Sequence, residues 1–246
     1  DGLDWQGRLN GVDLLFTTPS HQFPTTVTMP MNQREALLAE AKRRADAAGH
    51  FRYPFPREFG GRDGTNLGMA VIREHLTSKG LGLHCDLQNE HAIVGNNISL
   101  LLMLHYGSEA QKTEWVEPLA SGTQMFAFGI TEPAHGSDAT HMESTAVPDG
   151  DGWRLNGEKT WNTGIHTATH DLIFARTSGK AGDGEGITAF LVPTDSPGFA
   201  VKEMLWTFNM PTDHGHVTFE NVYVPGSAVF GQVGRGLQVV QHFFNE

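Results

Sequence analysis

The spacing of apolar residues changes near Gly122 and divides the chain into two parts. Before this residue, apolar side chains recur every three or four positions, which is the period of a helix with one buried face. The pattern predicts helices over residues 33–48, 65–79, 89–106 and 108–120. The third is apolar on most of its faces, so we expect it to be a buried core helix.

Residues with capping chemistry stand at the ends of these helices. Asn32, Thr65 and Ser108 precede three of them, and such side chains accept hydrogen bonds from first-turn N–H groups. The Ser108 segment also has the spacing of a capping box. Gly49 and Gly80 follow two helices, where a glycine adopts the left-handed conformation that ends a helix.

After Gly122 the pattern becomes that of short strands separated by turn residues. Strands are predicted at residues 125–130, 153–155, 158–162, 171–177, 186–192, 199–205 and 216–224. Asn156-Gly157 is the strongest short hairpin signal in the chain. Short strands at this spacing favour a small antiparallel β-sandwich or barrel.

A helical pattern restarts at Gly234 and runs to Glu246 without a cap or a breaker. We therefore expect an α+β protein with three parts, and a chain that stops inside the third. An all-helical N-terminal domain is expected at 1–123, a β domain at 124–231, and the first turns of a C-terminal helical bundle at 232–246. The first thirty residues are expected to be mostly irregular.

Composition excludes some classes of partner. The chain has 17 basic and 28 acidic residues, a formal net charge of -11, which argues against a general nucleic-acid or anionic-membrane surface. Cys85 is the single cysteine, so no intramolecular disulfide can form, which fits a reducing compartment. We expect its side chain to serve only in packing. The longest apolar run, 98–104, is too short to span a bilayer, and no secretory signal is recognisable. Because the chain begins at Asp1 rather than Met, a preceding targeting segment stays open.

The turn 131–138 carries backbone donors and hydroxyl groups. Gly136 permits conformations in which successive N–H groups point at one spot, and Ser137 adds a hydroxyl, so the turn suits a pyrophosphate. A turn stabilised by its own Ser or Asp side chains, with no ligand, explains the same residues.

Trp161 and Thr163 lie on the same face of a predicted strand because side chains alternate. Trp161 is suited to pack against a flat heterocycle while Thr163 reaches the polar edge of that heterocycle. The alternative is a Trp that fills the core of the sandwich.

Three further patterns have weaker chemistry. His166 and His170 have the spacing of a helical zinc pair but fall between predicted strands, so a surface loop is expected and no metal. The segments 149–151 and 183–185 are acidic and Gly-containing, and we expect hairpin turns there. The segment 214–216 is also expected to be a turn.

An ordered set of motifs resembles the acyl-CoA dehydrogenase family. It consists of Phe128-Gly-Ile-Thr-Glu-Pro, Gly136-Ser-Asp, Gly150-Asp, Asn156-Gly-Glu-Lys-Thr-Trp-Asn-Thr, Ala175-Arg-Thr, Phe190-Leu-Val-Pro and Phe219-Glu-Asn-Val-Tyr-Val-Pro. An early loop, Pro54 to Gly61, is similar as well, and the resemblance spans roughly residues 33–246. One departure is Asn162, where Ile or Val is commoner. Another is His135, which replaces a small residue.

The resemblance implies an FAD site in the β domain. The residues implied to bind the cofactor are Phe128, Ile130, Thr131, Gly136, Ser137, Trp161 and Thr163. Thr131 would hold the pyrimidine edge and Ser137 the pyrophosphate, with Ser137 also touching the pantetheine arm of the substrate. Trp161 would pack against the isoalloxazine and Thr163 would bond near flavin N5. The side chain of Asn162 is expected to face away from the flavin.

The implied reaction is α,β-desaturation of an acyl-CoA, as in fatty acid β-oxidation, with a Glu of raised pKa as the base. That base is expected outside this chain, and Glu246 is only a weak candidate. An electron-transfer flavoprotein or similar acceptor is implied, with a homodimer or homotetramer in the bacterial cytoplasm or the mitochondrial matrix. Other flavoprotein chemistry on this fold, of the nitroalkane oxidase or monooxygenase type, and a non-catalytic flavin-binding subunit stay open.

Overall fold

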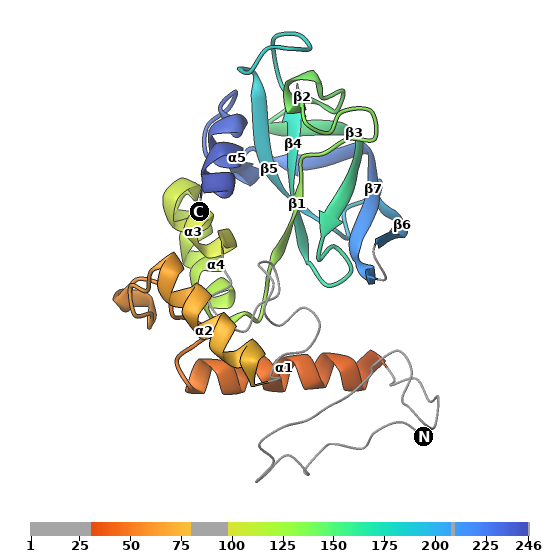
Figure 1. Ribbon diagram of the computed structural model, residues 1–246. Coiled ribbons are helices and arrows are strands. Elements are labelled where there is room, and N and C mark those ends of the chain that lie inside the picture. The colour runs from red at the N-terminus through yellow and green to blue at the C-terminus, as the bar shows by residue number, and fades with distance from the viewer. Residues whose placement is uncertain (1–30, 80–97, 208–209, 246) are drawn as a thin grey trace. The chain divides into compact units, whose positions relative to one another are not determined.

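The computed structural model describes residues 31–79, 98–207 and 210–245 (Figure 1). Contacts divide the chain into two compact units, Asp1–Asn96 and Asn97–Glu246. The first unit is helical where it is described and the second combines helices with a sheet, which confirms the predicted α+β class.

The predicted domain limits at 123 and 231 stay a prediction. The compact second unit includes two helices that precede residue 123 and one that follows residue 231. Several predicted features fall outside the described residues, namely the irregular start, Cys85, Gly80, Glu246 and the first half of the helix expected at 89–106.

The first unit contains α1 (Met31–Ala47), the short helix η1 (Arg57–Phe59) and α2 (Asn66–Ser78). Thr65 caps α2 as predicted, because its hydroxyl accepts a hydrogen bond from Gly68 N at 3.1 Å. Asn32 does not cap α1: the helix begins one residue earlier, so Asn32 lies inside its first turn.

The second unit contains α3 (Ile98–Tyr106), α4 (Glu109–Ser121) and α5 (Gly236–Asn245). Ser108 and the third residue of α4 form both bonds of the predicted capping box. Gly122 ends α4 with φ 69°, the left-handed conformation expected of a glycine there.

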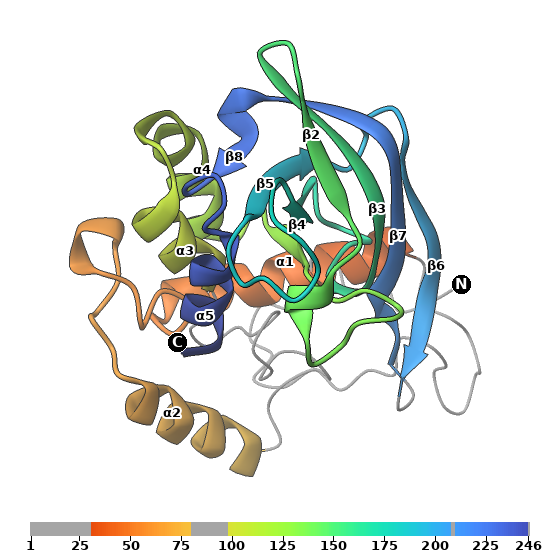
Figure 2. The same cartoon turned by 90° about the horizontal axis from the view of Figure 1, so that it is seen from above.

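Eight strands form one sheet in the order β6-β7-β3-β2-β4-β5-β8, with β1 paired to β4 (Figure 2). Their bounds are β1 Phe126–Gly129, β2 Thr145–Asp149, β3 Gly152–Thr163, β4 His170–Arg176, β5 Ile187–Pro193, β6 Phe199–Thr207, β7 Met210–Pro225 and β8 Val229–Phe230. The pairings of β1 with β4 and of β2 with β4 are parallel and the others antiparallel, so the sheet is mixed.

The predicted hairpin at Asn156-Gly157 is wrong, because β3 runs through both residues. The register of β3 against β7 shifts between Leu155 and Gly157, where Asn156 faces two residues of β7, so β7 has a bulge at Glu220-Asn221. Asn156 Oδ1 accepts a hydrogen bond from Asn221 N at 2.8 Å, and Asn221 has φ 51°. A Cβ on Gly157 would lie 2.2 Å from the Ser144 hydroxyl, so the Gly allows close packing rather than a turn.

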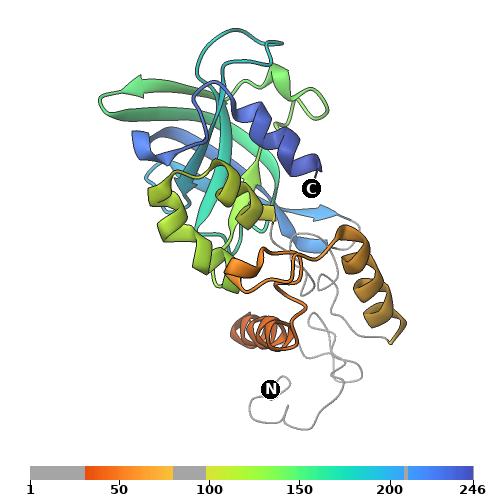
Figure 3. The ribbon, with the colours of Figure 1, turned by 90° about the vertical axis from the view of Figure 1, so that its left-hand side faces the viewer.

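The actual hairpin joins β2 to β3 through Asp149-Gly150-Asp151, as predicted for that segment, and it projects from the sheet (Figure 3). The strand β2 itself was not predicted. The turn expected at 214–216 is wrong, because these residues lie within β7 and pair with both β3 and β6.

The core of the second unit is formed by the inward faces of the strands. Its larger buried side chains include Leu155, Ile173, Phe190, Val217 and Phe219. Among the described residues, no helix is long and apolar enough to cross a membrane.

Candidate functional site

The loop that follows β1 is tied to β3 by main-chain bonds. Thr131 O accepts a hydrogen bond from Thr160 N at 2.9 Å. Glu132 and His135 then exchange two main-chain bonds, of 3.2 and 3.1 Å, around Pro133 and Ala134. The start of the motif segment 131–138 is therefore a closed turn held against the strand that carries Trp161.

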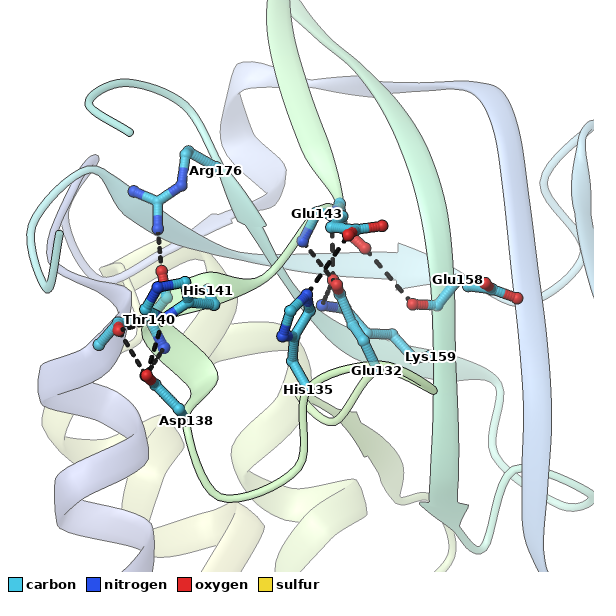
Figure 4. Close-up of polar contacts among 10 residues, drawn as sticks. Glu132, His135, Asp138, Thr140, His141, Glu143, Glu158, Lys159 and Arg176 are labelled. Atoms are coloured by element: carbon cyan, nitrogen blue, oxygen red, sulfur yellow. Dashed lines mark hydrogen bonds and ion pairs between the residues drawn. The ribbon is translucent and has the colours of Figure 1, made fainter. Parts of the chain in front are cut away.

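A buried ion pair reinforces this attachment (Figure 4). Lys159 Nζ lies 2.7 Å from Glu132 Oε1, and their side chains are 0% and 4% exposed. The Glu132 carboxylate also accepts hydrogen bonds from Glu143 N at 2.6 Å and Ser144 N at 3.0 Å. Burial raises the pKa of Glu132, but the Lys159 ammonium and these hydrogen bonds outweigh it and hold the pKa below its ordinary value.

The second half of the turn is open. Gly136, Ser137 and Asp138 are exposed, and a Cβ built on Gly136 would meet nothing within 4 Å. The backbone N–H groups of these three residues donate to no atom of the described part of the chain. Successive unpaired N–H groups beside open space are the features of an anion-binding turn.

Asp138 is the group that would oppose an anion here, but its carboxylate is turned toward other donors. It accepts hydrogen bonds from Thr140 N at 3.1 Å and from the Thr140 hydroxyl, and His141 Nδ1 lies 2.7 Å away. The Thr140 hydroxyl is the largest cause that holds the pKa of Asp138 below its ordinary value. In Figure 4 this side chain points to Thr140 and His141, at the start of the short helix η2 (Ala139–His141).

Arg176, at the end of β4, connects η2 to the loop between β4 and β5. Its guanidinium donates to the carbonyl oxygens of Thr140 at 2.6 Å and Asp183 at 3.2 Å, and to those of Ser178 and Glu185 at 3.3 Å each. The planar fork of an Arg suits this set of acceptors, whereas a Lys has one ammonium centre. This explains the Ala-Arg-Thr motif as a support of the turn.

Trp161 is not a core residue. Its side chain is 48% exposed, and its backbone has φ 67°, a conformation that bulky residues rarely adopt. Strained conformations of this kind concentrate at functional sites. The interpretation of this Trp as a core filler is therefore wrong, and a large part of the aromatic side chain is exposed.

Thr163 lies two residues further along β3. Its hydroxyl is 3.0 Å from His214 Nδ1 on β7, and the His214 ring lies edge-on to Trp161 at 6.5 Å between centroids. The register of β3 against β7 shifts between Lys159 and Asn162, so β3 is irregular at the end that carries Trp161 and Thr163.

Phe128 and Ile130 lie at the carboxyl end of β1. Phe128 stacks on Phe243 of α5 at 4.1 Å between centroids and also contacts Phe174 at 5.0 Å. Ile130 O lies 3.3 Å from Lys159 Nζ. The structure thus gives Phe128 an apolar partner on α5, while the main chain of Ile130 belongs to the surroundings of the buried Lys.

Comparison with known proteins identifies the family. The model of the acyl-CoA dehydrogenase N-terminal domain matches residues 25–123, and the model of the acyl-CoA dehydrogenase middle domain matches residues 127–222. The chain belongs to the acyl-CoA dehydrogenase family. Members of this family are FAD-dependent flavoproteins.

Named relatives agree with this assignment. The chain is 34% identical over 187 residues to the mitochondrial short-chain specific acyl-CoA dehydrogenase of Homo sapiens, covering 75% of this chain and 43% of the relative. It is 34% identical over 214 residues to the glutaryl-CoA dehydrogenase of Desulfococcus multivorans, covering 85% and 53%. The chain spans about half the length of the curated relatives it matches.

Solved structures show the same fold. An acyl-CoA dehydrogenase from Geobacillus kaustophilus superposes with a TM-score of 0.67 at 26% identity, covering 85% of this chain and 53% of that one.

Three supports of this candidate site were not predicted from the sequence. They are the Glu132–Lys159 pair, the Arg176 contacts, and a buried bond between Asn162 and Asp171. A Lys at the inward position of an alternating strand was the available signal for the first, because a buried Lys requires an acidic partner. His166, by contrast, is exposed in a loop, and the His170 ring packs edge-on against Trp115 at 4.7 Å.

Proposed function

We propose that the protein is an FAD-dependent acyl-CoA dehydrogenase that introduces an α,β double bond into an acyl-CoA thioester. The observation that carries this proposal is the pairing of an open turn of free N–H donors with a half-exposed, conformationally strained Trp on the neighbouring strand. The turn suits the diphosphate of the cofactor, and the Trp suits its flat ring system.

The residues present fit FAD. Gly136, Ser137 and the N–H groups around them would hold the pyrophosphate, and the backbone of Thr131 would meet the pyrimidine edge. Trp161 would pack on the isoalloxazine, with the Thr163 hydroxyl at its polar edge. Bound FAD supplies the two-electron acceptor that this reaction needs.

Phe128 and Ile130 would complete the wall next to β1, with Phe128 fixed by its stacking on Phe243. Ser137 would also contact the pantetheine arm of the substrate. We place the catalytic base outside residues 1–246. The same proposal includes an electron-transfer flavoprotein or similar protein as the electron acceptor. It also includes a homo-oligomeric state and a location in the bacterial cytoplasm or the mitochondrial matrix.

The chain's own contribution to catalysis would be to bind the cofactor and to orient its ring system. The Glu132–Lys159 pair and the Thr131–Thr160 bond hold the pyrophosphate turn against the strand of Trp161. The pyrophosphate and the isoalloxazine of the cofactor would thereby be held in a fixed relation.

The deciding experiment is an anaerobic titration of the flavin-loaded protein with a panel of acyl-CoAs, followed by the absorbance of oxidised flavin. Bleaching by one class of chain length would support dehydrogenation and name the substrate range. Bound flavin that no acyl-CoA bleaches would favour nitroalkane oxidase-like or monooxygenase chemistry, or a non-catalytic flavin-binding subunit.

The role of Ser137 in binding the cofactor is tested by Ser137→Ala. The control is Thr145→Ala, because Thr145 is an exposed hydroxyl residue on β2 of the same unit. Ser137→Ala should weaken flavin binding about tenfold, the effect of losing one hydrogen bond to a charged group, while Thr145→Ala should not. Equal affinities in the two variants would remove Ser137 from the cofactor site.

A further inference from the structure

Asn162 and Asp171 form a polar pair inside the apolar core of the second unit. Both residues are 0% exposed, and Asn162 Nδ2 donates a hydrogen bond to Asp171 Oδ2. Gly129 on β1 provides the space for them: a Cβ there would lie 2.7 Å from Asn162 Nδ2 and 3.1 Å from Asp171 Oδ1. The pair thus links β3 and β4 at a place where β1 has no side chain.

One hydrogen bond does not satisfy the two side chains. Asn162 Oδ1 and Asp171 Oδ1 are both buried, and neither has a hydrogen-bond partner among the described residues. Two unpaired oxygens in a core are costly, and neither of these can donate to the other while Asp171 is ionised. A proton on Asp171 Oδ1 changes this, because the resulting O–H can donate to Asn162 Oδ1 and close a ring of two hydrogen bonds.

The charges around the pair favour that proton. Lys159 is the cation facing Asp171, but it lies 2.7 Å from Glu132 and is already neutralised by that carboxylate. An ionised Asp171 would give this buried group of three a net charge of about minus one, which a core disfavours.

The other strands that pack against Asp171 contribute no charge. Its neighbours in register are Ala127 on β1 and Val192 on β5. The adjacent His170 points to the other face and packs against Trp115, where burial lowers its pKa and so favours the neutral ring. Burial raises the pKa of Asp171 to about 7, against the opposing effects of the Asn162 bond and Lys159.

We propose that Asp171 is a positioning residue, held as an uncharged carboxylic acid in a two-hydrogen-bond pair with Asn162, and that this pair fixes the part of β3 that carries Trp161 and Thr163. The flavin part of this inference rests on the proposed function. Asn162 is the residue between Trp161 and Thr163, so its side chain anchors a segment whose backbone is strained at Trp161. Loss of the pair would displace Trp161 and Thr163 together.

The first test needs no flavin. Infrared spectra of the protein at pH 6 are compared with those of Asp171→Asn, with Asp138→Asn as the control because Asp138 is exposed and its pKa is lowered. We expect a carbonyl band of a protonated carboxylic acid that is absent in Asp171→Asn, present in Asp138→Asn, and lost as pH rises through about 7. Absence of this band in the parent protein at pH 6 would overturn the uncharged pair.

The second test measures positioning through flavin affinity and the flavin absorption spectrum. Asp171→Asn can rebuild two hydrogen bonds as an amide pair, so its affinity should stay within about threefold of the parent value, whereas Asp171→Leu should lose about tenfold. The parent affinity should fall above pH 7, and that of Asp171→Asn should not. If Asp171→Leu does not fold, the apolar double variant Asn162→Leu/Asp171→Leu takes its place.

Equal affinity and equal pH profiles in the parent, Asp171→Asn and the apolar variant would overturn the positioning role. If the parent protein binds no flavin at all, the proposed cofactor site fails and the positioning role fails with it. The infrared result would still decide whether Asp171 is uncharged, so the two failures are distinguishable.

Discussion

Replacing Lys159 by Met would leave the Glu132 carboxylate buried without its cation. Glu132 would keep the hydrogen bonds from Glu143 N and Ser144 N, of 2.6 and 3.0 Å, but lose the 2.7 Å bond from Lys159 Nζ. Breaking a buried pair by removing one partner costs about 3–5 kcal/mol, because the remaining charge is uncompensated. For a unit of this size that corresponds to a fall in Tm of roughly 6–20 °C.

Chemical denaturation followed by circular dichroism would measure the loss, and the chain provides a matched control. Lys112→Met removes a 3.0 Å pair with Glu109 on α4, where the two side chains are 30% and 92% exposed. An exposed pair of this kind is worth about 0.5 kcal/mol or less. A Lys159→Met variant no less stable than Lys112→Met would refute the argument from burial.

Two further results would separate lost charge from lost packing. The double variant Glu132→Gln/Lys159→Met should lose less stability than Lys159→Met alone, because it leaves no uncompensated charge in the core, although the single amide oxygen of Gln replaces two carboxylate oxygens that each accept one N–H. In the parent, Glu132 has a pKa below its ordinary value of 4.5, so its contribution is complete above that pH and is lost as pH falls. In Lys159→Met, burial dominates instead, and the deficit should shrink on acidification as Glu132 takes up a proton.

The remaining predictions concern three supports of the site. Arg176→Lys should cost about 1–3 kcal/mol and make the β4–β5 loop more sensitive to limited proteolysis, because four carbonyl contacts need the planar fork. Gly129→Ala should cost about 1–3 kcal/mol by overpacking against Asn162, as measured by urea unfolding. The folded state should hold the Asp171 proton up to about pH 7 and the unfolded state only up to 3.8. Relative to Asp171→Asn, the parent is therefore most favoured below pH 3.8, and that advantage should be lost as pH rises through 7 in calorimetry.

Local chemistry explains which elements could be predicted. The caps of α2 and α4 and the Gly122 helix end depend on residues three or four positions apart, so the sequence displays them directly. The continuous course of β3 through Asn156-Gly157 depends instead on a bulge at Asn221, 65 residues away. A local turn signal was outweighed by pairing with a distant strand, which no window around Asn156 reveals.

The candidate site divides in the same way. Two exposed residues of the candidate site, Ser137 and Trp161, stand in the motifs that carry the family resemblance, so the sequence displays them directly. The residues that hold them in place were not found, since their roles depend on the register of separate strands. Asp171 comes directly before the apolar run of its strand, and its partner becomes visible only when the fold brings Asn162 of β3 against it.

The buried contacts also give a physical reason why two motifs 27 residues apart occur together in this chain. Glu132 in the first motif and Lys159 in the second are each costly to bury and are tolerated only as a pair. The bond from Thr160 N to Thr131 O joins the residue after Lys159 to the residue before Glu132. It therefore fixes the same two segments through the main chain. The turn that suits a pyrophosphate and the strand that presents Trp161 therefore behave as one unit. A substitution that loosens either should weaken the hold on both the pyrophosphate and the isoalloxazine of a bound flavin, rather than only on the group that it touches.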